Sequence, residues 1–286
     1  MIANRLSNNA FERKEPFREP KKIIWLSVEG TVTEINYFNF IEKYKEQIGI
    51  DATIRIEPLR KSDTHAGPAA VLELLEECES TMKTTVLEDI CELKELVNNL
   101  GNEKIKQYLT DKNKLTLDER EIITRTLKDV KYDVEYQKYI KNCNAEEDCF
   151  CIVVDTEGKD NPSRKDLYKV IDKCKNKGYK CFISNPCFEF FLLLHTYNPK
   201  KEYEENKENF INNPKISKVH TYVSDLLSKK NHHNKTISNT AFQESYLPNI
   251  KNALKSSKDW AYTLETVKND VGSNMIDFFN LVFEKK

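Results

Sequence analysis

IIWLSVEGTVTE (residues 23–34) runs from a short apolar stretch into an acidic turn that begins at Glu29. FCIVVDTEG (residues 150–158) follows the same pattern, and its apolar stretch ends at Asp155 and Glu157. Short apolar stretches bounded by turn residues are typical of buried strands. In open α/β sheets, ligands bind outside the carboxyl ends of the strands. Two such strands side by side would gather these carboxylates around one point, where Mg²⁺, a hard cation that prefers oxygen ligands, could join them.

Strand-like and helix-like patterns alternate through much of the chain. Apolar residues recur at intervals of three to four over residues 34–48 and 164–177, which predicts helices. Residues 53–57 and 179–184 carry the shorter patterns of strands. Strands that alternate with helices predict a parallel sheet. The fold class that we expect is therefore α/β.

A long helical pattern separates the second strand from the third. It covers residues 69–141, where Gly101 fits a helix stop. Thr116 with Glu119 forms a capping-box signature, which predicts a new helix after it. This stretch is either a helical hairpin inserted into the α/β domain or the crossover helices of the sheet itself. The sequence leaves both alternatives open.

SNPCFEFFLLLH (residues 184–195) predicts the start of a buried helix. Ser184 or Asn185 suits the N-cap, Pro186 suits the first helical position, and the residues that follow are apolar almost all round. Residues 198–214 are rich in Lys, Glu and Asn, which predicts a surface loop or linker. We expect a flexible N-terminus (1–20), an α/β domain (21–197) and a mostly helical C-terminal region packed on the core (198–286).

The composition excludes several classes of protein. The chain has 286 residues, 7 glycines and a formal net charge of −1. It is therefore not a globally basic nucleic-acid binder, and it has no Walker A pattern with which to hydrolyse ATP by itself. No apolar run approaches the roughly 20 residues that span a bilayer. Eight cysteines without a signal peptide predict reduced thiols and a cytoplasmic protein.

The candidate site residues also have ordinary structural explanations. Asp155 and Glu157 could belong to a surface turn that precedes the next helix. Glu29 follows a strand directly, and Gly30 lets the chain turn there, but Glu29 alone could be an exposed turn residue. Glu34 could be an acid that the helix dipole favours in a first turn. A carboxylate on an apolar helix is costly unless it is paired, so Glu189 either caps the helix or faces the acidic site. His195 could be a satisfied core histidine.

A basic cluster in the C-terminal region is the candidate contact for nucleic acid. It is either a solvated loop or a phosphate-binding segment, because lysine, histidine and asparagine side chains supply donors to phosphate oxygens. The residues concerned are Lys229, Lys230, His232, His233 and Lys235.

Two of these stretches are long enough to resemble a known family. VEGTVTEINYF (residues 28–38) resembles the EGxxTExxYF opening of the RloB family, which includes the AbiLii-type abortive-infection proteins. SNPCFEFFLLLH resembles that family's SNPxFExWLLLH signature, with Phe191 where the family usually has Trp. NDVGSN (residues 269–274) loosely resembles its C-terminal helix start. The resemblance runs from about residue 22 to about residue 285.

The resemblance implies a Toprim-like parallel sheet core, in which a glutamate follows the first strand and a DxD motif follows a later one. Glu29 and Asp155 match these positions, whereas Glu157 stands where the second aspartate is expected. The activity implied is phosphodiester hydrolysis with Mg²⁺ or Mn²⁺, and these three residues would be both its catalytic residues and its metal ligands. Supporting roles would fall to Glu34, Asn185, Glu189 and His195.

Three functions remain open at this point. The first is a nuclease that acts as the effector of an anti-phage abortive-infection system, together with an ABC- or AAA-type ATPase encoded nearby. The low net charge argues against extended duplex binding, which favours a compact RNA such as tRNA over long DNA. The second is a non-catalytic sensor or adaptor that regulates the ATPase. The third, weaker, function is nucleotidyl transfer on the same core.

Overall fold

In the part of the chain that the structure describes, five strands form a single sheet in the order β2-β1-β3-β4-β5. The computed structural model describes residues 21–59, 67–83, 100–129, 147–159, 163–231 and 236–283. The strands are β1 (Lys22–Val28), β2 (Ile54–Pro58), β3 (Cys149–Asp155), β4 (Lys180–Asn185) and β5 (Gly272–Ser273). The first four strands run parallel, and β5 pairs antiparallel with the end of β4. The expected α/β class with a mostly parallel sheet is confirmed.

Helices make up most of the remaining described structure. The longer ones are α1 (Thr33–Lys43), α3 (Pro68–Lys83), α5 (Asn102–Asp111), α6 (Leu117–Asp129), α8 (Ser163–Lys177), α9 (Phe188–Thr196), α10 (Lys200–Asn212), α11 (Tyr222–Asn231), α13 (Ile250–Ser257) and α15 (Met275–Val282). The short ones are α2 (Lys45–Ile48), η3 (Lys112–Lys114), α12 (Asn239–Ala241), η4 (Phe242–Tyr246), η5 (Leu247–Asn249) and α14 (Leu264–Val267). Within the described residues, none of these helices has both the length and the apolar character needed to cross a membrane.

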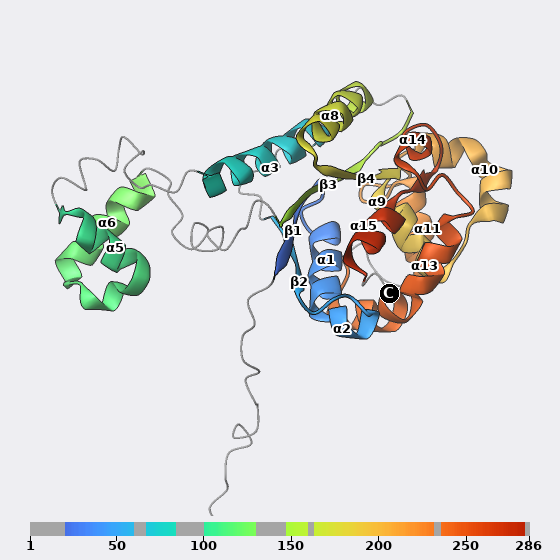
Figure 1. The fold of residues 1–286 in the computed structure, drawn as a ribbon. Coiled ribbons are helices and arrows are strands. Elements are labelled where there is room, and N and C mark those ends of the chain that lie inside the picture. Colours follow the sequence, from blue (N-terminus) through green and yellow to red (C-terminus); the bar gives the residue numbers. More distant parts are fainter. Residues whose placement is uncertain are drawn as a thin grey trace, which may run out of the picture.

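Helices cover both faces of the sheet (Figure 1). Successive side chains of a strand point to opposite faces, so Trp25 of β1 joins an apolar cluster with α3 and α8. Leu26 joins the larger cluster on the other face, with α1, α9 and α15. Burial on both faces explains why β1 and β3 read as continuous apolar runs rather than as alternating ones.

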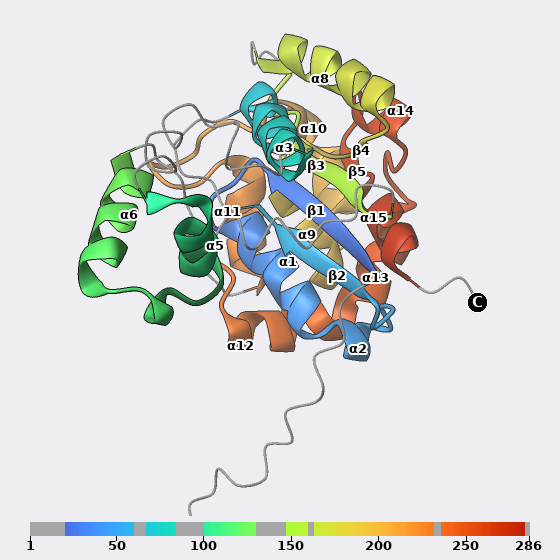
Figure 2. The ribbon, with the colours of Figure 1, turned by 60° about the vertical axis from the view of Figure 1, so that its left-hand side comes forward.

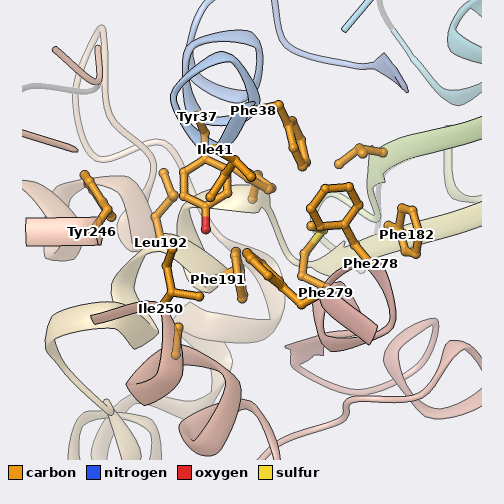
Figure 3. Packing of buried hydrophobic residues seen from close by; sticks show 14 of the residues in the cluster. Tyr37, Phe38, Ile41, Phe182, Phe191, Leu192, Tyr246, Ile250, Phe278 and Phe279 are labelled. Carbon is orange, nitrogen blue, oxygen red and sulfur yellow. The ribbon is translucent and has the colours of Figure 1, made fainter. Parts of the chain in front are cut away.

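Aromatic rings fill the larger cluster (Figure 3). The ring of Tyr37 on α1 meets Phe188 and Phe191 of α9 edge to face, at centroid distances of 5.5 and 6.0 Å. Phe38 meets Phe278 of α15 at 5.1 Å in the same manner. Edge-to-face pairs at these distances add to the stabilisation that burial provides. The predicted burial of the helix after Pro186 is confirmed, because α9 is buried from Phe188 to His195.

The helical stretch between β2 and β3 combines the two alternatives left open by the sequence. α3 is a crossover helix, because it packs on β1, β3 and α8. α5 and α6 contact each other, and Figure 1 shows this pair set apart from the sheet. The predicted capping box is present at the start of α6: the Thr116 amide donates to Glu119 Oε2 at 3.0 Å, and the Glu119 amide donates to Thr116 Oγ1 at 3.3 Å.

Two local predictions were wrong. Ser184 and Asn185 do not cap α9, because β4 continues through them and pairs them with β5, and the N-cap position of α9 is Cys187. Residues 198–214 are not a linker, because α10 occupies most of them. This helix is mostly polar, but it also has a few apolar residues that pack against the core, such as Phe210, which is fully buried. The expected flexible segment, residues 1–20, lies outside the described residues.

Candidate active site

The carboxyl ends of β1 and β3 bring Glu29 and Asp155 together. The two strands are parallel neighbours, with Val28 opposite Val153. The Glu29 amide donates to the Val153 carbonyl at 3.0 Å, and the Asp155 amide donates to Glu29 Oε2 at 3.0 Å. The Glu29 side chain therefore folds across the end of β3, where Asp155 begins the acidic turn.

Glu34 enters the same region from the first turn of α1. Only 8% of this residue is exposed, and its carboxyl group lies directly over Gly30. A Cβ atom at Gly30 would stand 1.8 Å from Glu34 Oε2, so the space above Gly30 is what lets the glutamate approach. The helix dipole favours an acid at this position. The negative charge of Glu34 also raises the pKa of Asp155.

The acidic turn after β3 is held on two sides. On one side, the Thr156 amide donates to the Ser184 carbonyl at 3.0 Å, and the Glu157 amide donates to the Pro186 carbonyl at 2.9 Å. On the other side, a Cβ atom at Gly158 would stand 2.3 Å from the backbone oxygen of Asn212, at the end of α10. Glu157 itself has a φ of 57°, a left-handed conformation that costs free energy in a non-glycine residue.

Glu189 completes the group of acids from the first turn of α9, where only 7% of it is exposed. The neighbouring thiol of Cys187 hydrogen-bonds to Glu189, and it also accepts from Asn213 Nδ2 at 3.5 Å. Burial, and then Glu189 and Asp155, raise the pKa of the Cys187 thiol well above its usual value. Sequence reasoning did not single out Cys187 or Asn213, although Cys187 lies inside the family signature.

The pKa of Asp155 depends on the other acidic side chains near it. Burial raises the pKa of this carboxyl well above its usual value, and the negative charges of Glu34, Glu29, Glu189 and Glu157 raise it further. Five carboxylates from β1, α1, β3 and α9 therefore share one neighbourhood. Like charges brought together out of water favour either a proton or a cation.

These residues fit a divalent cation by their chemistry, because carboxylate oxygens are the ligands that Mg²⁺ and Mn²⁺ prefer. As the side chains stand, no three His, Cys, Asp or Glu residues in the described part of the chain are grouped so that they could hold a metal ion. Glu29, for example, is engaged with the Asp155 amide. Rotation of such side chains would be needed to bring the oxygens to a common point.

His195 lies in the aromatic core. Its Nδ1 is 3.2 Å from the carbonyl oxygens of Phe191 and Leu192, and its Nε2 is 3.1 Å from the Tyr37 hydroxyl. Carbonyls accept only, so Nδ1–H donates to them and the Tyr37 hydroxyl donates to Nε2. Burial lowers the pKa of His195 to about 4. The neutral ring thus has partners at both nitrogens, as the core alternative predicted.

The remaining predicted residues lie elsewhere. Asn185 Nδ2 donates to the Val267 carbonyl at 2.9 Å, which ties β4 to α14. Lys229 pairs with Asp225 at 2.6 Å, and Lys230 pairs with Glu202 at 3.2 Å. The other members of the basic cluster, His232, His233 and Lys235, lie outside the described residues.

Comparison with known proteins gives one family. The model of the family described as "RloB-like protein" matches residues 24–280, which is most of the chain. No curated protein and no solved structure gives a significant match.

Proposed function

The chain belongs to the RloB-like family, and from this premise we propose that it is a divalent-cation-dependent nuclease that cleaves RNA. One observation carries the proposal: five carboxylates gather where β1 and β3 end, and four of them raise the pKa of Asp155. Such crowding is costly for a site that holds no cation, and carboxyl ends of parallel strands are where ligands of α/β sheets bind.

The roles of the residues follow from their positions. Asp155 and Glu157, at the end of β3, would hold Mg²⁺ or Mn²⁺ directly or through water. A cation held there supplies positive charge to the phosphate group and acidifies water. Glu29 is placed to be a further ligand or the group that moves the proton, because its carboxylate already reaches the Asp155 amide. Glu34 and Glu189 add negative charge that keeps a cation in place.

Hydrolysis by activated water suits the side chains available. Cys187 is a potential nucleophile beside the acids, but burial keeps the pKa of its thiol high, so it is a poor attacking thiolate. His195, a common general base, is occupied by core partners on both nitrogens. The net charge of −1 favours a compact RNA such as tRNA over long DNA. An ATPase partner and a role in abortive infection belong to this proposal through the family resemblance.

The test compares the wild type with Asp155→Asn, and uses Asp118→Asn at the exposed start of α6 as the matched control. Each protein, alone and with the neighbouring ATPase, is incubated with total RNA and with plasmid DNA, in Mg²⁺, in Mn²⁺ and in EDTA. We expect RNA cleavage that needs the cation, with a loss of at least about 100-fold in Asp155→Asn and none in the control. Equal cleavage by Asp155→Asn would contradict the proposal.

A non-catalytic adaptor that regulates the ATPase is the second candidate. The observation in its favour is that no three potential ligands among the described residues stand ready to hold a metal ion, which an adaptor would not require. The adaptor hypothesis predicts no cleavage under any condition. It also predicts that Asp155→Asn stimulates or inhibits the ATPase as strongly as the wild type does.

A further inference from the structure

α8 carries an unusual concentration of positive charge for this protein. Its fifteen residues include six basic and two acidic side chains, whereas the whole chain has a net charge of −1. Leu167, Val170 and Cys174 pack the apolar side of the helix into the cluster with α3. The basic side therefore faces outward, and both ribbon views show α8 on the outside of the molecule (Figure 2).

Three lysines form a row along this outer side. Lys165, Lys169 and Lys173 are all exposed, and their spacing of four residues places them on one face of the helix, about 6 Å apart along its axis. Two exposed acidic residues, Asp166 and Asp172, lie along the same side, and Asp166 pairs with Lys169 at 3.1 Å. Exposed pairs of this kind contribute little free energy, so a phosphate group can replace the carboxylate.

The row starts at the edge of the sheet where the acidic site lies. α8 begins at Ser163, soon after Glu157, and it returns the chain from the carboxyl end of β3 to the start of the parallel strand β4. Its first turn therefore lies toward the carboxyl edge of the sheet, and the row leads away from that edge. At that end Arg164 donates to the Lys268 carbonyl at 2.8 Å, which fixes α8 against the residues that follow α14.

An exposed aromatic ring adds a second kind of contact. Tyr168 is 39% exposed and flanks the row on one side, where its hydroxyl donates to Asn269 Oδ1 at 3.1 Å. A ring fixed in this way offers a face on which an unpaired base can stack. Lys229 and Lys230 of α11 both pair with carboxylates, of their own helix and of α10, whereas in the α8 row Lys169 is the lysine with such a pair among the described residues.

We propose that the outer face of α8, formed by Lys165, Tyr168, Lys169 and Lys173, binds the phosphate backbone of an unpaired segment of the RNA substrate and leads it to the carboxylates. This inference rests on the proposed function. A positive surface of this kind would also help RNA to approach the site, because a cluster of acids repels phosphate groups unless a positive surface attracts them.

The test is RNA binding without cleavage. A fluorescein-labelled single-stranded RNA is titrated in EDTA with the full chain and with Lys165→Glu/Lys169→Glu/Lys173→Glu. The matched control is Lys251→Glu/Lys255→Glu/Lys258→Glu, which reverses three exposed lysines on and just after α13. Each phosphate contact with a single strand adds about 0.7 to the salt slope, so the α8 variant should bind on the order of 100-fold more weakly at 0.1 M salt, with a slope smaller by about 2. The control should bind like the wild type, and Tyr168→Ala should weaken binding without changing the slope.

Several results would overturn the inference: no RNA binding by the wild type, equal losses in the α8 variant and the control, or a loss confined to Lys229→Glu/Lys230→Glu. Circular dichroism of each variant checks that the fold is retained. The binding readout also separates this inference from the proposed function. If the wild type binds through α8 but cleaves no RNA, only the nuclease function fails. If the α8 variant binds and cleaves like the wild type, only the inference fails.

Discussion

Protonation of His195 should cost the folded protein stability, and the size of this cost follows from its burial. Burial lowers the pKa of His195 from 6.5 to about 4. Burial favours the neutral ring, so the folded protein has its full stability above pH 6.5. It loses stability as the pH falls toward 4, because the unfolded chain takes up the proton more readily. Linkage between these two values gives a loss of about 2 kcal/mol between pH 7.5 and pH 5.

Urea unfolding of wild type and His195→Leu at both pH values measures this loss. At pH 7.5 the variant should be the less stable protein, because the hydroxyl of Tyr37 loses its acceptor, at a cost of about 1–3 kcal/mol. At pH 5 this difference in unfolding free energy should change by about 2 kcal/mol in favour of the variant. The reason is that only the wild type must remove a proton from an imidazole in order to fold. Tyr37→Phe is the control, because it keeps the histidine and should keep the pH dependence of the wild type.

A difference in unfolding free energy that is the same at both pH values would refute the reasoning. It would mean that His195 can take up a proton in the folded protein without penalty, as a residue open to solvent or to the carboxylates would. The supporting catalytic role would then return as the better explanation of its place in the family signature.

The other predictions concern the acidic turn and the helical pair. Burial, and then the neighbouring carboxylates, raise the pKa of Asp155, so the wild type loses stability as this carboxyl ionises with rising pH. Asp155→Asn in EDTA should therefore gain stability relative to wild type from acidic to neutral pH in urea unfolding. Gly158→Ala should cost about 1–3 kcal/mol in the same assay, because its methyl group meets the Asn212 carbonyl; an unchanged midpoint would show that the contact is loose. Thr116→Ala should cost about 1 kcal/mol locally, seen as faster amide hydrogen exchange in α6, whereas exchange in α9 stays the same.

The strands and the acidic edge could be predicted because they depend on local and general rules. Buried parallel strands must be apolar on both faces, so the runs before Glu29 and Asp155 are visible in the sequence. The rule that parallel strands end at one edge then brings the two acids together. The capping box at Thr116 and Glu119 is likewise local, because both partners lie within one helical turn.

Other features depend on contacts that no local pattern reveals. α10 looks like a linker because its composition is polar, and its buried Phe210 has meaning only beside Tyr203 and Tyr222. β5 is only two residues long, and Gly272 is needed there because a Cβ atom would stand 1.9 Å from the Ala261 carbonyl. The cap predicted at Asn185 failed for the same reason, since pairing with β5 keeps this residue in the strand.

Cation binding at the carboxyl ends of β1 and β3 is the most direct test of the central claim. Isothermal titration of Mn²⁺ into the metal-free protein should show one cation per chain for wild type and for the control Asp118→Asn, and a loss of that binding for Asp155→Asn. Mn²⁺ is a suitable probe because it accepts the same oxygen ligands as Mg²⁺. Binding to Asp155→Asn that equals the wild type, or no binding to the wild type, would contradict the account.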